Sequence, residues 1–290
     1  MAGQLRDIKR RIISVQSTQK ITRAMELIAS SRIIKAQQRV EAARPYAEEM
    51  RKLMAAVAKN AGNIDHPLLK KRGEGSSKVG MIVISSDRGL AGAYNSSILR
   101  TAERNLEDSS NAKIFPVGKK AISYFKFRGY EFEESWQGFS ERPGIDDARA
   151  VARAASQAFS DGEVDEVRLA FTKYKSALTQ IPQVQKLIPA SDDLDTDEEE
   201  TDDGKSAGYL FEPEPAEILG LLLPRYIEGA VYQGMLEGAA SELSARRRAM
   251  KAATDNADEV IENLTRVYNQ ARQAEITTEI MEVVGGAEAL

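Results

Sequence analysis

The chain has no cysteine among its 290 residues. Disulfides, thiolate metal sites, cysteine nucleophiles and thiol switches are therefore excluded. Histidine is almost as scarce, because His66 is the only one and it precedes a proline in a stretch with the composition of a loop. A Ser-His-Asp triad or a histidine-rich metal site would have to be built around this one side chain. We therefore expect no catalytic residue, no cofactor-binding residue and no metal ligand.

Long apolar runs are also missing. The longest, from Ile218 to Leu223, is interrupted by Gly220 and stops at Pro224, whereas a membrane-spanning helix needs about 20 apolar residues. Charged residues near the N-terminus break up any apolar signal core. We expect no direct membrane insertion and no export, so any membrane association would run through partner proteins.

Aromatic residues make up only 6% of the chain, while charged residues make up 29%. This balance favours long helices with polar faces over one large packed core. Charge is also unevenly placed: residues 1–60 hold 13 Lys and Arg against 5 Asp and Glu, and residues 192–203 hold nine acids and no base. The acidic stretch lacks the spacing of an EF-hand, so we expect a solvated loop rather than a calcium site.

The first 60 residues carry apolar side chains at alternating steps of three and four. An average period of 3.5 residues indicates a left-handed coiled-coil seam, and a helix of this length would extend about 85 Å. Pro45 removes one backbone hydrogen bond, so we expect a bend there. The predicted seam positions are Leu5, Ile8, Ile12, Val15, Gln19, Thr22, Glu26, Ala29, Ile33, Ala36, Val40, Ala43, Ala47, Met50, Met54 and Val57.

A second pattern of the same kind follows Pro213 and Pro215, two residues that suit the first turn of a helix. We expect this helix to bend at Pro224 and to end at Gly285-Gly286. The predicted seam positions are Leu236, Ala239, Leu243, Arg246, Met250, Ala253, Ala257, Val260, Leu264, Val267, Ala271, Ala274, Thr278 and Met281.

Between the two helices, strand and helix patterns alternate. Alternation of this kind predicts a mainly parallel sheet covered on both faces. The expected strands are 78–85, 113–117, 130–134, 164–174 and 183–189, with a hairpin across Ser176 to Pro182. The expected helices are 95–106, 119–128 and 145–160.

Neither long helix is stable alone, because each has one apolar stripe. The residues between the two helices form a separate domain, so the helices can pair antiparallel. If Asn60 lies opposite Pro213, equal rise places Glu26 opposite Arg247. We therefore expect Glu26 to pair with Arg246 or Arg247, the charged interruptions of the two seams. The same register leaves the last 15 or so residues of the second helix without a partner.

Several long motifs resemble the gamma subunits of F-type ATP synthases. They are Val15 to Glu26 (VQSTQKITRAME), Ser85 to Gly92 (SSDRGLAG), Met250 to Ala257 (MKAATDNA) and Tyr268 to Thr277 (YNQARQAEIT). They occur in the family's order and cover essentially the whole chain. The cysteine-bearing insert of the chloroplast form and a transit peptide are both missing, which favours the bacterial type.

The resemblance implies an α/β fold plus a long antiparallel coiled coil, in which the N- and C-terminal helices pair and a Rossmann-like domain is inserted. The expected segments are 1–60 for the N-terminal shaft helix, 61–212 for the α/β foot domain, and 213–290 for the C-terminal shaft helix. Residues 191–208 form the acidic loop, to which we assign no function.

The resemblance further implies a non-catalytic rotor shaft that couples proton-driven c-ring rotation to the catalytic beta subunits. Its partners would be a ring of three alpha and three beta subunits, the epsilon subunit and the membrane c-ring, at the cytoplasmic face of the bacterial plasma membrane. Met25 would lie beside the acidic loop of the beta subunits, Arg246 in the region where the shaft interacts with the ring, and Arg272 and Gln273 at contacts near the top of the shaft. With Glu26 and Arg247, these are the six residues that we expect to contact other subunits.

Three other functions are weighed against this one. An enzyme could use the turn from Asp87 to Gly92 as a phosphate loop, but the turn matches neither common phosphate-binding motif. The basic N-terminal helix could bind nucleic acid, but it has no interleaved aromatic residues for stacking on bases. The chain could also be a free-standing coiled-coil scaffold with an α/β domain.

Overall fold

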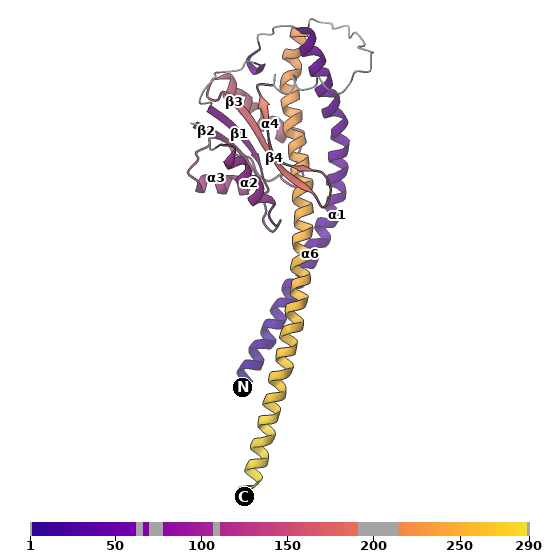
Figure 1. Ribbon diagram of the computed structural model, residues 1–290, viewed down its shortest axis with the longest axis vertical. Helices are drawn as coiled ribbons and strands as arrows, with labels where there is room; N and C mark the ends of the chain where they lie inside the picture. The colour runs from indigo at the N-terminus through magenta and orange to yellow at the C-terminus, as the bar shows by residue number, and fades with distance from the viewer. Residues whose placement is uncertain (1, 62–65, 70–77, 107–110, 191–214, 289–290) are drawn as a thin grey trace. The chain divides into compact units, whose positions relative to one another are not determined.

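The computed structural model describes residues 2–61, 66–69, 78–106, 111–190 and 215–288 (Figure 1). Contacts divide the chain into two compact units, one made of Met1–Ser30 with Arg246–Leu290 and the other of Ser31–Ala245. Two long helices, α1 (Ala2–Ala61) and α6 (Pro215–Glu288), each contribute to both units. The expectations for the acidic loop 191–208 and for Pro213 fall outside the described residues.

The larger unit contains a four-stranded sheet in the order β2-β1-β3-β4. The central strand β1 (Lys78–Ile84) pairs in parallel with β2 (Asn111–Val117) and with β3 (Glu166–Tyr174). The last strand, β4 (Gln180–Ile188), returns antiparallel beside β3. The expectation of a mainly parallel sheet is therefore confirmed.

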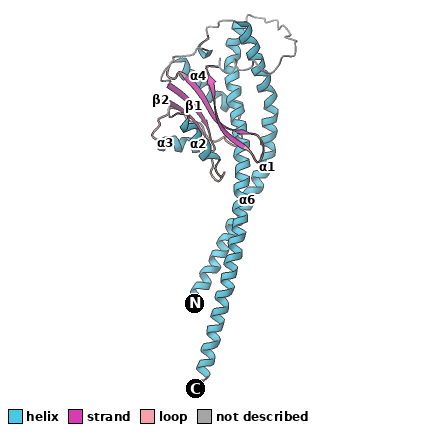
Figure 2. Cartoon of the chain, in the orientation of Figure 1, coloured by secondary structure: helices cyan, strands magenta, loops and turns pink. Residues whose placement is uncertain are grey.

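Helices cover both faces of this sheet (Figure 2). One face buries Val79, Met81 and Val83 of β1 against α2 (Tyr94–Arg104) and α3 (Lys119–Phe127). The other face packs against α4 (Ile145–Ser160), the 215–245 part of α6, the end of α1 and the short 3₁₀ helix η1 (Pro67–Leu69). Both faces being buried explains why β1 reads as an unbroken apolar run.

Two glycines bring α6 close to the sheet. A side-chain carbon added at Gly234 would lie 3.2 Å from Ile84 Cδ1 and 3.3 Å from Leu169 Cδ2. At Gly238 it would lie 3.2 Å from Ile84 Cγ2. Both distances are tighter than ordinary packing, so the small residues let the helix backbone approach the strands directly.

Two expectations for the inserted domain need correction. Residues 130–134 form no strand, because Tyr130 and Phe132 pack against the core beside α3, and the backbone meets β2 only through an isolated bridge between Val117 and Trp136. The turn between β3 and β4 is shorter than expected, since β4 already begins at Gln180.

The seam predicted on α1 is confirmed. Every predicted position from Leu5 to Val57 is buried or half-buried, while most positions between them are exposed. In the larger unit, Ile33, Ala36 and Val40 form a cluster with Leu236, Ala240 and Leu243 of α6. Periodicity alone therefore identified the buried stripe of this helix.

The seam predicted on α6 is wrong at alternate positions from Val260 onward, namely Val260, Val267, Ala274 and Met281. Val260 and Val267 are 37% and 44% exposed, whereas Thr254 is 5% exposed. The helix also continues through Gly285-Gly286 to Glu288 and does not end there. The buried or half-buried positions are Met250, Thr254, Ala257, Ile261, Leu264, Tyr268, Ala271, Glu275 and Thr278, with Ala253 also half-buried.

Candidate functional site

Two side-chain contacts define the register of the helical pair in the smaller unit. Thr22 Oγ1 lies 2.8 Å from Thr254 Oγ1, and Gln19 donates a hydrogen bond to Asp258. The pairing is antiparallel, as expected. It is displaced by about one helical turn, however, because the expected register would put Thr22 opposite residue 251.

The displaced register changes the surroundings of Glu26. Equal rise now places Met250 opposite Glu26 and Ser30 opposite Arg246. Glu26 forms an ion pair with Arg23 of its own helix, with an N–O distance of 3.2 Å. A contact between Glu26 and Arg246 or Arg247 stays a prediction.

The six predicted contact residues all belong to the smaller unit and fall into two groups. Met25, Glu26 and Arg247 are half-buried and Arg246 is buried, whereas Arg272 and Gln273 are exposed. Twenty-five residues separate Arg247 from Arg272, which corresponds to about 37 Å along α6. The two groups therefore cannot contact one subunit at one point.

The C-terminal part of α6 presents an uncovered apolar stripe. Figure 1 shows α6 continuing past the residue where α1 begins. The exposed apolar side chains there recur at helical spacing: Ile276, Ile280, Met281, Val283 and Val284. A contiguous apolar surface of this kind marks an interaction site.

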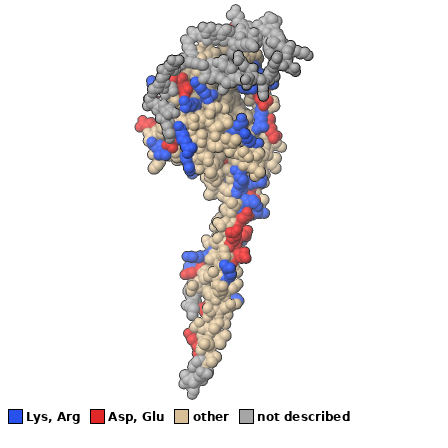
Figure 3. All heavy atoms as spheres, in the orientation of Figure 1, with Lys and Arg blue, Asp and Glu red and all other residues tan. Residues whose placement is uncertain are grey.

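Charges of both signs line the helical pair. Arg10 pairs with Asp7 within α1, and the part of α6 opposite residues 17–21 carries Asp255, Asp258 and Glu259. Figure 3 shows both signs along the pair on the face that it presents. The excess of basic residues on α1 is thus partly balanced by its partner helix, which disfavours a nucleic-acid interface.

In the larger unit, the carboxyl end of β1 leads into the turn from Asp87 to Gly92. The carboxylate of Asp87 accepts three backbone hydrogen bonds, from Lys119 N (3.1 Å), Gly138 N (2.9 Å) and Ser140 N (3.1 Å). Lys119 is the first residue of α3. A carboxylate at the start of a helix is favoured by the helix dipole and by the unpaired N–H groups there.

This geometry bears on the phosphate-loop alternative. The backbone donors that would hold a phosphate at this edge of the sheet already bind Asp87, an anion supplied by the chain itself. A phosphate would therefore have to displace this carboxylate and would be repelled by its negative charge. The sequence signal for the role of Asp87 was its position, directly after a strand and ahead of two glycines.

The segment held by Asp87 also reaches α1. Glu141, which follows Ser140, forms ion pairs with Arg32 of α1 and with Arg88 of the turn, the latter at 3.8 Å. Beside Arg88, Leu90 is exposed and has a φ of 62°, a left-handed conformation that is strained for leucine. The turn is thus held rigidly from two sides while presenting an apolar side chain.

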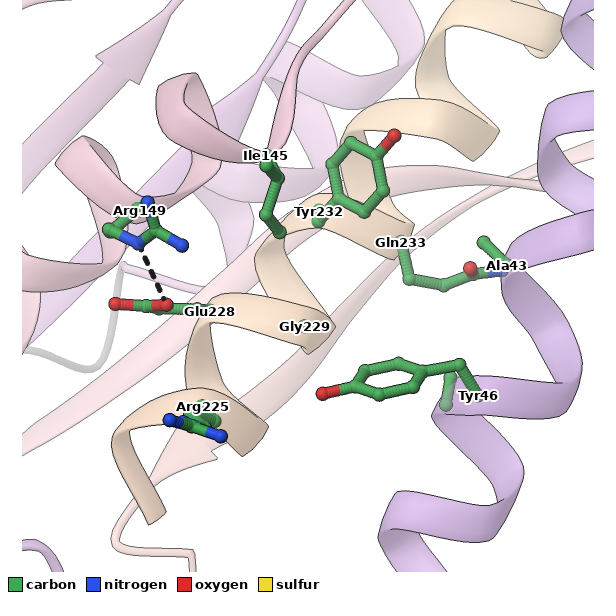
Figure 4. Close-up of a pocket in the computed structure, with 10 residues that line it drawn as sticks. Ala43, Tyr46, Ile145, Arg149, Arg225, Glu228, Gly229, Tyr232 and Gln233 are labelled. Carbon is green, nitrogen blue, oxygen red and sulfur yellow. Dashed lines mark hydrogen bonds and ion pairs between the residues drawn. The ribbon is translucent and has the colours of Figure 1, made fainter. Parts of the chain in front are cut away.

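A cavity of about 470 Å³ lies between α1, α4 and α6 (Figure 4). Its walls include Tyr46 of α1, Arg149 of α4, and Glu228 and Gln233 of α6. Arg149 Nε donates to Glu228 Oε2 over 3.2 Å, which links α4 to α6 at the rim. Apolar side chains of Ala43, Ala47 and Ile145 also line it.

His66 has a structural role. Its Nδ1 accepts a hydrogen bond from the backbone N–H of Leu68 at 3.2 Å, and burial lowers the pKa of the imidazole below its ordinary 6.5. A neutral ring is required for that acceptor.

We expect His66 to make the fold less stable in mild acid. Below about pH 6.5 the unfolded chain takes up the proton first, because its imidazole keeps the ordinary pKa, so stability falls with pH until the folded pKa is passed. Urea denaturation at about pH 7.5 and about pH 5.5 should show a larger loss for the unmodified chain than for His66→Asn, which keeps an acceptor without titrating. Equal losses would contradict this role.

Neither a membrane-spanning helix nor a metal-binding group appears where the structure is described. No helix there is long and apolar enough to cross a bilayer. No group of three or more His, Asp or Glu side chains there is placed to hold a metal ion.

Together, the fold and these sites define a class: proteins in which two long helices pair, a doubly wound domain is inserted between them in the sequence, and one helix end is uncovered. The family model described as "ATP synthase" matches residues 4–290. The ATP synthase gamma chain of Acidothermus cellulolyticus is 48% identical over all of this chain and 98% of its own length. That of Frankia casuarinae is 49% identical over all of this chain and 99% of its own length.

Solved structures agree with this assignment. The central stalk and c-ring structure of the Tetrahymena thermophila mitochondrial ATP synthase includes a chain that is 26% identical, with a TM-score of 0.61 over 80% of this chain and 99% of that one. A rotor chain of the Euglena gracilis mitochondrial ATP synthase shares the fold, with a TM-score of 0.68 at 18% identity over 95% of this chain and 100% of that one. The chain belongs to the ATP synthase gamma chain family, of bacterial type.

Proposed function

We propose that this chain is the central rotor shaft of a proton-transporting F-type ATP synthase. It couples rotation of the c-ring, driven by proton flow, to conformational cycling of the catalytic beta subunits, for ATP synthesis and in reverse for hydrolysis. In doing so it regulates both ATPase activity and proton flow. The chain itself contributes no catalytic group.

The uncovered end of α6 is the observation that carries this proposal. Ile276, Ile280, Val283 and Val284 are all exposed on a helix that has no partner among the described residues at that level. Such a stripe would be costly in water and needs a surrounding surface. A ring of three alpha and three beta subunits supplies one.

A shaft of this kind works through differential contact. An asymmetric helical pair inside a threefold ring touches three identical beta subunits in three different ways. It can bias each subunit only by interacting more favourably with one of its conformations than with the others. Rotation then exchanges the three states, and no nucleophile, base or metal is needed in the shaft.

Four of the six contact residues take roles in this arrangement by family resemblance. Met25 lies beside the acidic loop of a beta subunit, and Arg272 and Gln273 form contacts near the tip. Arg246 belongs to the region where the shaft interacts with the ring, and Glu26 and Arg247 are included through the pairing predicted between the two helices. The exposed positions of Arg272 and Gln273 suit hydrogen bonding to a surrounding subunit.

The foot of the shaft would engage the epsilon subunit and the membrane c-ring through the α/β domain. The chain is then a peripheral protein at the cytoplasmic face of the bacterial plasma membrane, held there by the complex. It needs neither nucleic acid nor a membrane-inserted segment of its own.

Reconstitution tests this proposal. The chain is combined with alpha and beta subunits of an actinobacterial relative, and ATPase activity is compared with that of the ring alone. With epsilon and the membrane sector added, hydrolysis should drive proton pumping. A well-folded chain that fails to assemble, or that assembles without any effect on hydrolysis, would refute the shaft function.

A further inference from the structure

Strand β3 extends past its neighbour on one side. The ladder between β1 and β3 ends at the pair Val83–Ala170, while β3 continues to Tyr174. The backbone groups of residues 172 and 174 on this side therefore have no strand partner within the described ladder. Buried backbone groups of this kind require another partner.

Two side chains of α6 satisfy that open edge. Ser241 Oγ donates to the backbone oxygen of Thr172 at 3.2 Å, and Glu237 Oε2 accepts from Tyr174 N at 3.0 Å. Four residues along a helix rise about 6 Å and two residues along a strand about 6.6 Å, so the two spacings match. This part of α6 thus takes the place of a missing strand.

The same strand end is tied to α1. The backbone oxygen of Tyr174 accepts a hydrogen bond from Arg44 Nη2 at 3.2 Å, and Gln37 donates to the phenol oxygen of Tyr174. The three polar groups of this one residue therefore bind both long helices. Tyr174 also packs in the apolar cluster that contains Val40 and Leu236.

Glu237 is buried, and both of its carboxylate oxygens accept hydrogen bonds. It is 5% exposed, and its second oxygen accepts from Gln233 Nε2 at 2.8 Å. The amide oxygen of Gln233 is buried and has no hydrogen-bond partner among the described residues, and Gln233 lines the cavity in Figure 4. A carboxylate in an apolar helix segment is costly to bury unless both oxygens are hydrogen-bonded, so its presence indicates a positional requirement.

We propose that Tyr174 and Glu237 form the joint through which a turning force on the α/β domain reaches both long helices. This inference rests on the proposed function and specifies how the domain is fastened to the shaft. Tyr174 and Glu237 are positioning residues, since neither has a chemical role. A joint of hydrogen bonds with defined directions resists sliding and twisting better than apolar packing alone, which is not directional.

The joint needs a hydrogen-bond acceptor at position 237 and not a charge. In Glu237→Gln, the amide oxygen can accept from Tyr174 N, and the amide nitrogen can donate to the unpaired oxygen of Gln233 once the amide of Gln233 turns over. In Glu237→Ala, the Tyr174 N–H stays buried and unpaired. The first variant should therefore keep the joint and the second should lose it.

Tyr174→Phe provides an independent variant, because it deletes only the hydroxyl that binds Gln37. Tyr130→Phe is its matched control: Tyr130 lies in the same domain, and its ring packs edge-on against Phe125 at a centroid distance of 5.4 Å, on the side of the sheet away from α6. Both changes remove one oxygen atom from a tyrosine.

The measurement is the ratio of ATP-driven proton pumping to ATP hydrolysis by the complete complex in inverted membrane vesicles. Glu237→Ala should lower this ratio by about twofold to thirtyfold, the range expected when one coupling element between distant sites is weakened. Tyr174→Phe should lower it less, and Glu237→Gln and Tyr130→Phe should leave it unchanged. A purely structural role would reduce the amount of complex and both rates together, with no change in the ratio.

The outcomes separate the two proposals. If the unmodified chain drives no pumping, the shaft function fails. If it drives pumping and Glu237→Ala keeps the normal ratio, only the joint fails. If the complex with Glu237→Ala does not assemble, the complex with Tyr174→Phe provides the test. A ratio of pumping to hydrolysis equal to that of Tyr130→Phe overturns the joint, and a lower ratio supports it.

Discussion

Ala29→Glu is expected to separate the helical pair of the smaller unit. Ala29 lies in the seam of α1 and is 1% exposed. A carboxylate there would be buried without a partner, which costs about 3 to 5 kcal/mol. The loss should be local, because the sheet and its helices form a separate compact unit. Hydrogen exchange should therefore accelerate in residues 2–28 and 250–275 while the strands keep their protection.

Leu27→Glu is the matched control for this change. Leu27 is two residues away on the same helix and is 59% exposed, so the same carboxylate would remain in water and cost no more than about 0.5 kcal/mol. In the isolated chain the two variants should differ strongly. Equal exchange rates in both would show that the burial of α1 does not depend on the seam.

The pair of variants also tests the shaft function. Ala29→Glu should abolish stimulation of ATPase activity in the reconstituted ring, because the two helices no longer present one surface. Leu27→Glu leaves the pair intact, so any loss of activity with this variant would come from the surface that faces the ring. Comparing stability with activity thus separates internal packing from contact with partners.

Asp87→Ala is expected to destabilise the α/β unit by about 3 kcal/mol, since three backbone N–H groups lose a charged acceptor. Released from Asp87, the segment from Gly138 to Glu141 should also lose its hold on Arg32 of α1. Urea denaturation measures the first effect. Asp146→Ala is the control, because that carboxylate is 86% exposed and pairs only with Arg149 among the ion pairs of the described chain, so its removal should cost less than about 1 kcal/mol.

A second readout identifies what Asp87 replaces. With the carboxylate removed, the backbone donors at the start of α3 become an open anion site. Sulfate or inorganic phosphate should then stabilise Asp87→Ala in thermal denaturation and leave the unmodified chain and Asp146→Ala nearly unaffected. If neither anion raises the stability of Asp87→Ala, the donors do not converge as the hydrogen bonds of Asp87 indicate.

The two seams show most clearly how much of the structure could be predicted from the sequence. On α1 the alternative stripe with three-four steps would place Arg11, Arg32 and Arg39 in the seam, so only one stripe fits a 3.5-residue period. On α6 the sequence offers two neighbouring apolar choices at several steps, such as Val260 or Ile261 and Val267 or Tyr268. Periodicity cannot choose between adjacent apolar residues, because the choice depends on how the partner helix turns this one.

The register between α1 and α6 was likewise predicted only in part. Counting residues from both ends of the inserted domain predicted the antiparallel pairing and came within one turn of the contact between Thr22 and Thr254. The remaining turn depends on where each helix leaves the domain, and one of those exits lies in a stretch with no periodic pattern. The prediction of a strand at 130–134 was wrong because the apolar side chains of this segment pack against α3 while its backbone does not pair with the sheet.

Local pattern by itself determined the order of the strands and helices apart from the strand expected at 130–134, the buried stripe of α1, and membership of the gamma chain family through four long motifs. Tertiary structure alone decided which residues connect these parts. Asp87 binds the backbone N–H groups at the start of α3, and Glu237 and Ser241 bind the open edge of β3. Their acidic and hydroxyl side chains are ordinary in the sequence. They became identifiable only when folding placed them beside buried backbone groups that had no other partner.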